Sequence, residues 1–185
     1  MKKLLMAVFA LCVVLGLAAC GDKEADYKLG MGVEVSTSSS TNATAEKAGN
    51  AQVDATVAAV VVDKDGKIVA CRLDAVQNKI AVSATGELTA TFGDTKRCLK
   101  EEYGMGGKPY SPDNDGDGRV LEWYEQSLAF SKHVVGMTAA EVAAMTTKTA
   151  NDHEISTDET LLAAGCTIQI TGIKAVVAKS ANNAR

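Results

Sequence analysis

The residues whose spacing is most suggestive of chemistry are three aspartates in the stretch DNDGDG. Asp113, Asp115 and Asp117 alternate, and Gly118 stands sixth counting from Asp113, which matches the first half of a calcium-binding loop. Position twelve, where such a loop needs a bidentate Glu, is Tyr124. We therefore expect a solvated Asp/Gly turn and no metal site, and weak calcium binding at extracellular concentrations stays open as the alternative.

The histidines do not suggest a hydrolytic site. His133 lies within a helical pattern and His153 lies in a polar loop. Neither is close in sequence to a candidate nucleophile, and a Ser or Cys hydrolase needs a base beside its nucleophile. The sequence therefore leaves hydrolytic chemistry without support.

The N-terminus has the pattern of a secreted, lipid-anchored protein. Lys2 and Lys3 precede an almost wholly apolar run over residues 4–17, and the quartet Leu17-Ala18-Ala19-Cys20 follows. The run is short for a membrane span, and the quartet is similar to the bacterial lipobox. We expect residues 1–19 to be cleaved as a signal peptide, Cys20 to carry the lipid, and residues 20–26 to form a tether. A plain signal peptide is the alternative.

Charge narrows the classes of partner. Loss of residues 1–19 removes Lys2 and Lys3 and takes the formal charge from −4 to −6. A negative balance argues against nucleic acid as a partner and against docking on an anionic membrane driven by charge. The remaining length suits one extracytoplasmic domain held at the cell membrane by its lipid.

The remaining cysteines do not form a recognisable framework. Cys71, Cys98 and Cys166 are left when the signal peptide and the lipidated cysteine are set aside, and the sequence has no CxxC pair. A zinc site and a disulfide framework are therefore not indicated. One disulfide with a free thiol, or three buried thiols, are both compatible with the sequence.

The first half of the chain reads as strands. Residues 27–35 have a strand pattern, and a Ser-rich stretch over 36–52 is expected to be a long loop within the domain. Two β-branched runs over 53–77 are separated by Asp63-Lys64-Asp65-Gly66, which predicts a β-hairpin. A weaker strand pair is expected over 80–92, followed by a short helix that begins near Asp94 or Thr95.

The second half reads as helices with one returning strand. A wide apolar stripe predicts a helix over 120–135 that ends at Gly136, and Thr138 with Glu141 has the spacing of a capping box for the next helix. Ser156 and Glu159 predict another cap within 153–165. Apolar and polar residues alternate over 166–172, which predicts a strand. The pattern over residues 173–184 predicts a terminal helix that frays. The fold class is therefore α+β: a twisted antiparallel sheet containing the hairpin 53–77, packed by helices from the second half.

Four stretches occur in an order and spacing that resemble a known family. They are AQVDATVAAVVVDKDGKI, LKEEYGMGGKP, EWYEQSLAFSKHVVGMTAAEV and LLAAGCTIQITGI. They resemble secreted lipoproteins of the FMN-binding domain family, which also includes flavin-carrying subunits of membrane electron-transport complexes. The resemblance covers roughly residues 27–178 and implies an FMN-binding-like domain over 27–180. It also implies FMN as cofactor and a membrane redox partner.

The resemblance implies a place for the flavin. In that family a separate transferase often attaches FMN as a phosphoester to a Thr or Ser that ends a motif of the form D-x-x-[ST]-x-[AV]-[ST]. Aligned on this motif, the acceptor is Thr167, but Leu161 replaces the acidic residue, Ala163 the first hydroxyl and Cys166 the small apolar residue. The match for covalent attachment is therefore incomplete.

Further residues are expected beside the flavin. Turn amides near Gly165, or the helix that begins near Gly172, would hold its phosphate, and Trp123, Tyr103 and Met105 would contact its ring. The function implied is electron transfer by a membrane-anchored extracytoplasmic protein. The alternative is a non-catalytic surface lipoprotein of the same fold that binds a ligand or partner without flavin, with Thr167 an ordinary strand residue.

Overall fold

The structure is a computed structural model that describes residues 26–91, 93–105, 121–150 and 152–185. The expected signal peptide, the lipid-bearing Cys20 and the aspartate triplet at 113, 115 and 117 lie outside the described residues.

A four-stranded antiparallel sheet forms the first half of the domain, in the order β1-β2-β3-β4. Its strands are β1 (Tyr27–Ser36), β2 (Gly49–Asp63), β3 (Ile68–Val82) and β4 (Leu88–Thr91). The hairpin predicted over 53–77 is confirmed, and its strands extend further in both directions. Its turn contains Gly66 at a φ of 75°, which a side chain would oppose. Alternation of β-branched and small residues directs Ala58, Val60 and Val62 into the core.

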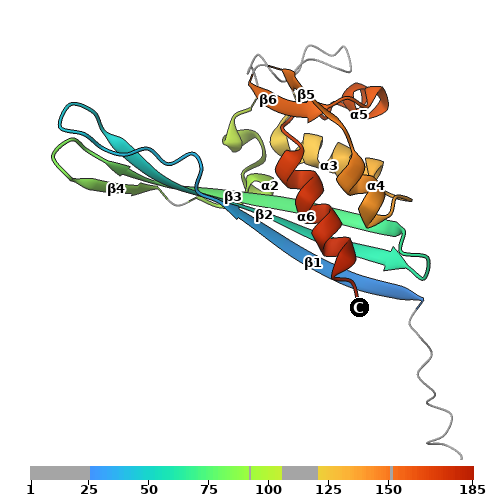
Figure 1. The fold of residues 1–185 in the computed structure, drawn as a ribbon. Coiled ribbons are helices and arrows are strands. Elements are labelled where there is room, and N and C mark those ends of the chain that lie inside the picture. The colour runs from blue at the N-terminus through green and yellow to red at the C-terminus, as the bar shows by residue number, and fades with distance from the viewer. Residues whose placement is uncertain (1–25, 92, 106–120, 151) are drawn as a thin grey trace, which may run out of the picture.

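The second half supplies the helices, which lie on one face of this sheet (Figure 1). They are α2 (Lys96–Leu99), the 3₁₀ helix η1 (Lys100–Tyr103), α3 (Trp123–His133), α4 (Ala139–Ala144), α5 (Glu159–Ala163) and α6 (Thr171–Asn182). Helix α6 packs on β1 and β2, while α3 packs on β3. Phe130, Val134 and Val176 of this layer are fully buried. The α+β fold expected from the sequence is confirmed.

Helix starts follow the predicted caps, with one correction. The hydroxyl of Thr138 accepts from the N–H of Glu141, and the capping box of α4 is complete. Helix α5, by contrast, is capped by Asp158 and not by Ser156. Ser156 instead ends β6 (His153–Ser156), which pairs with β5 (Thr147–Ala150). The helix expected within 153–165 therefore begins later, because its first four residues belong to a hairpin.

Residues 166–172 are not the strand that their alternation predicts, since 166–170 form neither helix nor strand and the last two residues begin α6. A strand needs a neighbour to receive its ladder of hydrogen bonds, and here the backbone bonds go elsewhere. The N–H of Thr167 donates to the side chain of Gln126 at 2.9 Å, and the N–H of Ile170 donates to the carbonyl of Glu154 at 3.0 Å. The segment is an irregular connection from α5 to α6.

The C-terminal helix is firmly attached, whereas the sequence predicted that it frays. Leu29 exchanges backbone hydrogen bonds with Arg185, both at 3.3 Å. Close approach is possible because β1 carries Gly30 and Gly32 under α6. A methyl group at Gly30 would lie 1.9 Å from the carbonyl oxygen of Ser180. The glycines of β1 therefore set the distance between sheet and helix.

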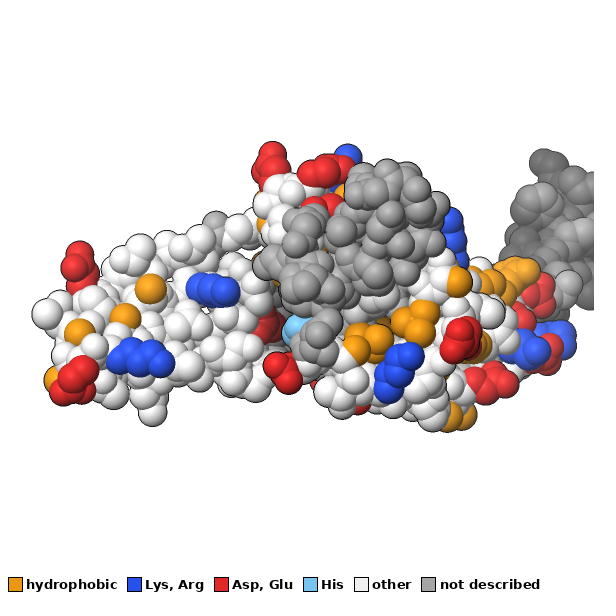
Figure 2. All heavy atoms as spheres, turned by 90° about the horizontal axis from the view of Figure 1, so that it is seen from above, with side chains coloured by type: hydrophobic (Ala, Val, Ile, Leu, Met, Phe, Trp, Pro, Cys, Tyr) orange, Lys and Arg blue, Asp and Glu red, His pale blue; other side chains and the backbone are white. Residues whose placement is uncertain are grey.

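The molecule is elongated, because the sheet extends beyond the helical layer. The far ends of β2 and β3, together with β4 and the loop that follows β1, project as an arm (Figure 1). The face shown in Figure 2 has acidic and basic side chains scattered over it, without a continuous basic patch. None of the described helices has the length and apolar character to cross a membrane.

Candidate functional site

Thr167, the acceptor implied by the family resemblance, is held in the interior. It is 6% exposed, and its hydroxyl donates to Oε1 of Gln126 at 3.2 Å, beside the backbone bond to the same oxygen. Gln126 lies on α3, is completely buried, and donates its own amide to the carbonyl of Leu121 at 2.9 Å. A phosphoester at this oxygen does not fit these surroundings, because the hydroxyl is bonded and enclosed.

A cleft nevertheless lies beside this segment, where the arm of the sheet leaves the helical layer. It has a volume of about 420 Å³, within the range of small-molecule sites. Trp123, Tyr103 and Met105, the three residues expected to contact a ring, all line it. Ile168, which follows Thr167, lines it too. The structure therefore brings the expected ring contacts together, and Thr167 is behind the wall of the cleft.

A lysine lies against the aromatic wall. The ammonium group of Lys96, from α2, is 4.6 Å from the centre of the Tyr103 ring and 5.7 Å from that of Trp123. Both distances are within the range of cation–π contacts. Lys96 also lines the cleft. Helix α2 is positioned for this by Thr95, whose side chain accepts from the N–H of Cys98. The cleft thus combines an aromatic surface with a positive charge.

The first turn of α6 forms the opposite part of the wall. Gly172 and Ile173 line the cleft, and a methyl group added at Gly172 would meet no atom within 4 Å. No described side chain caps this helix at Ile170. Its early N–H groups therefore provide partial positive charge near the cleft. The cleft is also lined by polar residues that include Asp54 and Gln77 of the sheet, with His153 and Gln169.

Gly165 and Cys166 have structural positions. Gly165 follows α5 with a φ of 86°, the conformation expected of the residue that ends a helix. Cys166 is completely buried, and burial raises the pKa of its thiol to about 12. Burial also raises the pKa of Cys71, to about 11. Among the described residues Cys71, Cys98 and Cys166 are all free thiols, and the raised pKa values of Cys71 and Cys166 make these two poor nucleophiles.

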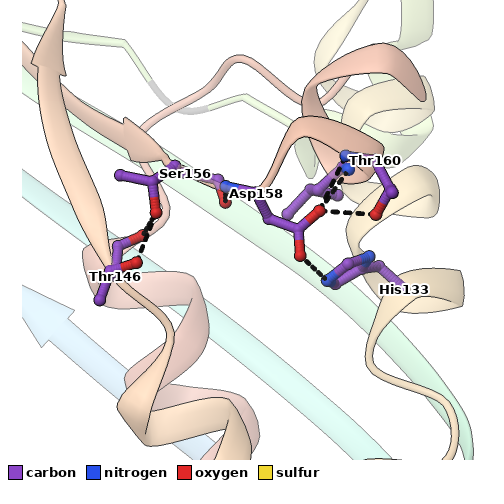
Figure 3. A network of polar contacts seen from close by, with 7 residues as sticks. His133, Thr146, Ser156, Asp158 and Thr160 are labelled. Carbon is purple, nitrogen blue, oxygen red and sulfur yellow. Dashed lines mark hydrogen bonds and ion pairs between the residues drawn. The ribbon is translucent and has the colours of Figure 1, made fainter.

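His133 has a carboxylate partner that its sequence neighbours do not reveal. Its Nε2 lies 3.5 Å from Oδ2 of Asp158, the residue that caps α5 (Figure 3). The other oxygen of Asp158 accepts from the N–H groups of Thr160 and Leu161 at 2.8 and 3.1 Å. Ser156 is 1% exposed, and its hydroxyl accepts from the N–H of Asp158 at 3.0 Å. The hydroxyl of Ser156 therefore binds a backbone N–H. The contact between His133 and Asp158 links α3 to α5.

Sequence reasoning missed Gln126, Lys96 and the sheet residues of the cleft. Gln126 belongs to EWYEQ, the most specific part of the resemblance, and a polar residue on the apolar stripe of a helix is the signal that could have found it. Lys96 has no such signal, since its contact with the rings depends on how α2 folds back over the sheet. In the part of the chain that the structure describes, no three His, Cys, Asp or Glu residues form a group suited to a metal ion.

Comparison of the chain with family models, with curated proteins and with solved structures gives no match in any of the three. Functional inference therefore depends on the chemistry of the cleft. Its aromatic and thioether wall, one ammonium group and an uncapped helix start suit a planar apolar ring that carries an anionic group.

Proposed function

We propose that this protein is a membrane-anchored extracytoplasmic protein that binds FMN without a covalent bond and takes part in electron transfer. The cleft beside Trp123 is the observation that carries the proposal. The lipid anchor at Cys20 and the extracytoplasmic location come from the signal sequence. The resemblance to the FMN-binding domain family supports the choice of ligand.

Each part of the ligand has a matching part of the cleft. Trp123, Tyr103 and Met105 would contact the isoalloxazine ring, and the first turn of α6 at Gly172 would receive the phosphate. Lys96 lies against the rings of Tyr103 and Trp123 and lines the same cleft, so it would neutralise negative charge on a bound flavin. The flavin would supply the redox chemistry, while these residues would set its orientation, its exposure to water and its charge environment.

The alternative function is binding of another ligand or partner in the same cleft, without flavin. The enclosed hydroxyl of Thr167 is the observation that favours it, because the family's covalent attachment needs a reachable acceptor. This alternative expects an anionic or neutral aromatic ligand other than a flavin.

Titration of the purified full chain with FMN and with riboflavin tests the proposal. Fluorescence of Trp123, the one tryptophan of the chain, and of the flavin would both report binding. We expect FMN to bind more tightly than riboflavin. We expect Lys96→Ala to weaken FMN binding about tenfold, since a charge-assisted contact is lost. The difference in affinity between FMN and riboflavin should become smaller in this variant.

Two further variants sharpen the titration. Gly172→Glu places a carboxylate at the start of α6, where nothing obstructs it, and should abolish the preference for FMN. Lys132→Ala removes an exposed lysine from the far end of α3 and should leave binding unchanged. Absence of flavin binding, or binding that is indifferent to Lys96 and Gly172, would contradict the proposal.

A further inference from the structure

The sheet has an apolar outer face, opposite the helices in Figure 1. Along β1 this face presents Tyr27, Leu29, Met31 and Val35, which are 61%, 65%, 64% and 62% exposed, and Val33, which is 39% exposed. In the antiparallel register Leu29, Met31 and Val33 stand beside Val61, Ala59 and Val57 of β2. The apolar surface therefore extends from β1 onto β2. A continuous exposed apolar surface of this kind marks an interaction site.

The free edge of β1 is closed to another strand over its central part. The carbonyl of Val33 accepts from Nζ of Lys179 at 2.8 Å, and the carbonyl of Met31 accepts from Nδ2 of Asn183 at 3.5 Å. Leu29 is paired with Arg185. Because both backbone groups of Leu29 and the carbonyls of Met31 and Val33 already have partners from the end of α6, addition of a strand is opposed. The outer face itself is the surface left for an interaction.

A cationic hollow adjoins the apolar face. It has a volume of about 320 Å³ and is lined by Val57 and Ala59 of the face together with Arg72, Arg97, Lys100 and Asp74. The guanidinium of Arg97 donates to the carbonyl of Leu73 at 3.5 Å and to the hydroxyl of Ser127 at 3.3 Å. Within the described residues these three cations form no ion pair with a carboxylate. Asp74 compensates part of this charge, but with three cations against one carboxylate the lining is net positive, which favours a phosphate group.

The position of the tether favours a membrane as the occupant. Tyr27, the first residue of β1, follows the proposed lipid attachment at Cys20 by seven residues, a distance of about 25 Å at full extension. The outer face therefore begins within reach of the bilayer surface. Tyrosine is favoured at the membrane–water interface, and the headgroups of phospholipids carry the phosphate that matches the cationic hollow.

We propose that the outer face of the sheet lies on the phospholipid bilayer that anchors Cys20. Leu29, Met31 and Val35 enter the interfacial region, while Arg72, Arg97 and Lys100 contact headgroup phosphates. The inference rests on the lipid anchor of the proposed function and is independent of flavin binding. Because the chain as a whole is negative, apolar contact and local charge hold the face in place, and long-range attraction does not.

The test uses the full lipidated chain in vesicles of phosphatidylcholine and phosphatidylglycerol, with brominated acyl chains as quenchers of tryptophan. Met31→Trp places a reporter on the outer face, and Glu159→Trp places a control reporter on exposed α5, in the helical layer. Trp123 is buried and gives a constant background. We expect bromine to quench the Met31→Trp reporter strongly and the Glu159→Trp reporter little. Leu29→Glu added to Met31→Trp should lower the docked fraction about tenfold, since an apolar contact is lost.

The possible outcomes distinguish the lipid anchor from the docking of the outer face on the bilayer. Flotation with vesicles, together with the mass of the N-terminal peptide, reports the lipid anchor, and a chain that fails to float contradicts both the anchor and the docking. A chain that floats but shows equal quenching of the two reporters contradicts the docking alone. A face-to-face dimer, seen as a doubled mass by chemical crosslinking in vesicles with an unquenched Met31→Trp reporter, assigns the face to a second copy and overturns the proposal. FMN titration of the same samples reports the flavin independently.

Discussion

At the scale of single residues, Gln126 fixes the connection between α5 and α6 through its hydrogen bonds to Thr167. It lies on α3, is fully buried, and receives both the backbone N–H and the hydroxyl of Thr167 on one oxygen. A buried donor without a partner is costly. The connection that separates the cleft from the core therefore depends on one side chain from a different element.

We predict that Gln126→Ala lowers the free energy of unfolding by about 3 kcal/mol, because it leaves the N–H of Thr167 unpaired and opens a cavity. Urea denaturation would measure the loss. Gln169→Ala is the matched control, since Gln169 is exposed on the same connection and should cost under about 0.5 kcal/mol. Equal losses in the two variants would contradict this role for Gln126.

Asp158 should make a pH-dependent contribution. The hydroxyl of Thr160, the N–H groups of Leu161 and Thr160 and, last, His133 hold the pKa of this carboxyl below its usual value, against desolvation, which raises it. A depressed pKa in the folded state stabilises the protein above the ordinary pKa of Asp, and that stabilisation is lost as the pH falls through the lower, folded-state value.

We therefore predict that Asp158→Asn is less stable than the parent at pH 7 by about 0.5 kcal/mol, a small figure because the carboxyl is 42% exposed. The difference should shrink towards zero as the pH falls below about 4. Thermal unfolding of both proteins across this range is the measurement. A gap that stays constant with pH would show that the charge of Asp158 is not responsible.

Close packing of α6 on β1 decides the architecture at the scale of elements. Gly30 and Gly32 are buried under this helix, and a methyl group at Gly32 would lie 2.8 Å from the hydroxyl oxygen of Ser180 and 3.0 Å from the carbonyl of Val176. That hydroxyl donates to the carbonyls of Ala58 and Val176 at 3.0 and 2.7 Å. The contact therefore ties helix and sheet by both shape and hydrogen bonds.

We predict that Gly30→Ala destabilises the protein by about 3 kcal/mol, since backbone atoms of α6 have to move to admit the methyl group. Gly93→Ala adds the same methyl group where nothing lies within 4 Å and should change stability by less than about 0.5 kcal/mol. Chemical denaturation of the two variants side by side would measure this, and a tolerated Gly30→Ala would mean that α6 is not held at this distance.

Local patterns predicted the elements well where the chain itself supplies the signal. The hairpin around Gly66 and the capping box of Thr138 and Glu141 are both observed. The strand predicted over residues 166–172 was wrong, because alternation of apolar and polar residues does not show whether a neighbouring strand exists to pair with. Similarly, the docking of α6 depends on glycines in β1, which lie far away in sequence. Contacts between distant segments also explain why Lys96 could not be placed at the cleft.

At the scale of the whole molecule, the strand pair predicted over 80–92 is observed as the end of β3 paired with β4, but no local pattern indicated that it would project beyond the helical layer as an arm (Figure 1). Residues of β4 are all exposed, and within the described part of the chain they pair with Lys79–Val82 of β3 alone. The helical layer lies over the other end of the sheet (Figure 1). Because the arm buries little apolar surface, its stability should fall well below that of the strands under the helices.

We predict that backbone amides of β4 exchange with deuterium at least about a hundredfold faster than those of Ala58–Val62 in β2. Hydrogen-exchange mass spectrometry with peptides from each segment would measure the ratio. Addition of saturating FMN should slow exchange at Asp54 and Gln77, where the arm borders the cleft. Uniform protection along the sheet would contradict a weakly held arm.

At the same scale, we propose that flavin binds in the cleft without a covalent bond. The most direct measurement is the visible spectrum of the full chain purified from cells that also make the flavin transferase, followed by acid precipitation and a mass for the Thr167 peptide. We predict a flavin spectrum, release of FMN into the supernatant and an unmodified peptide. A colourless protein, or flavin that stays attached to Thr167, would contradict the account.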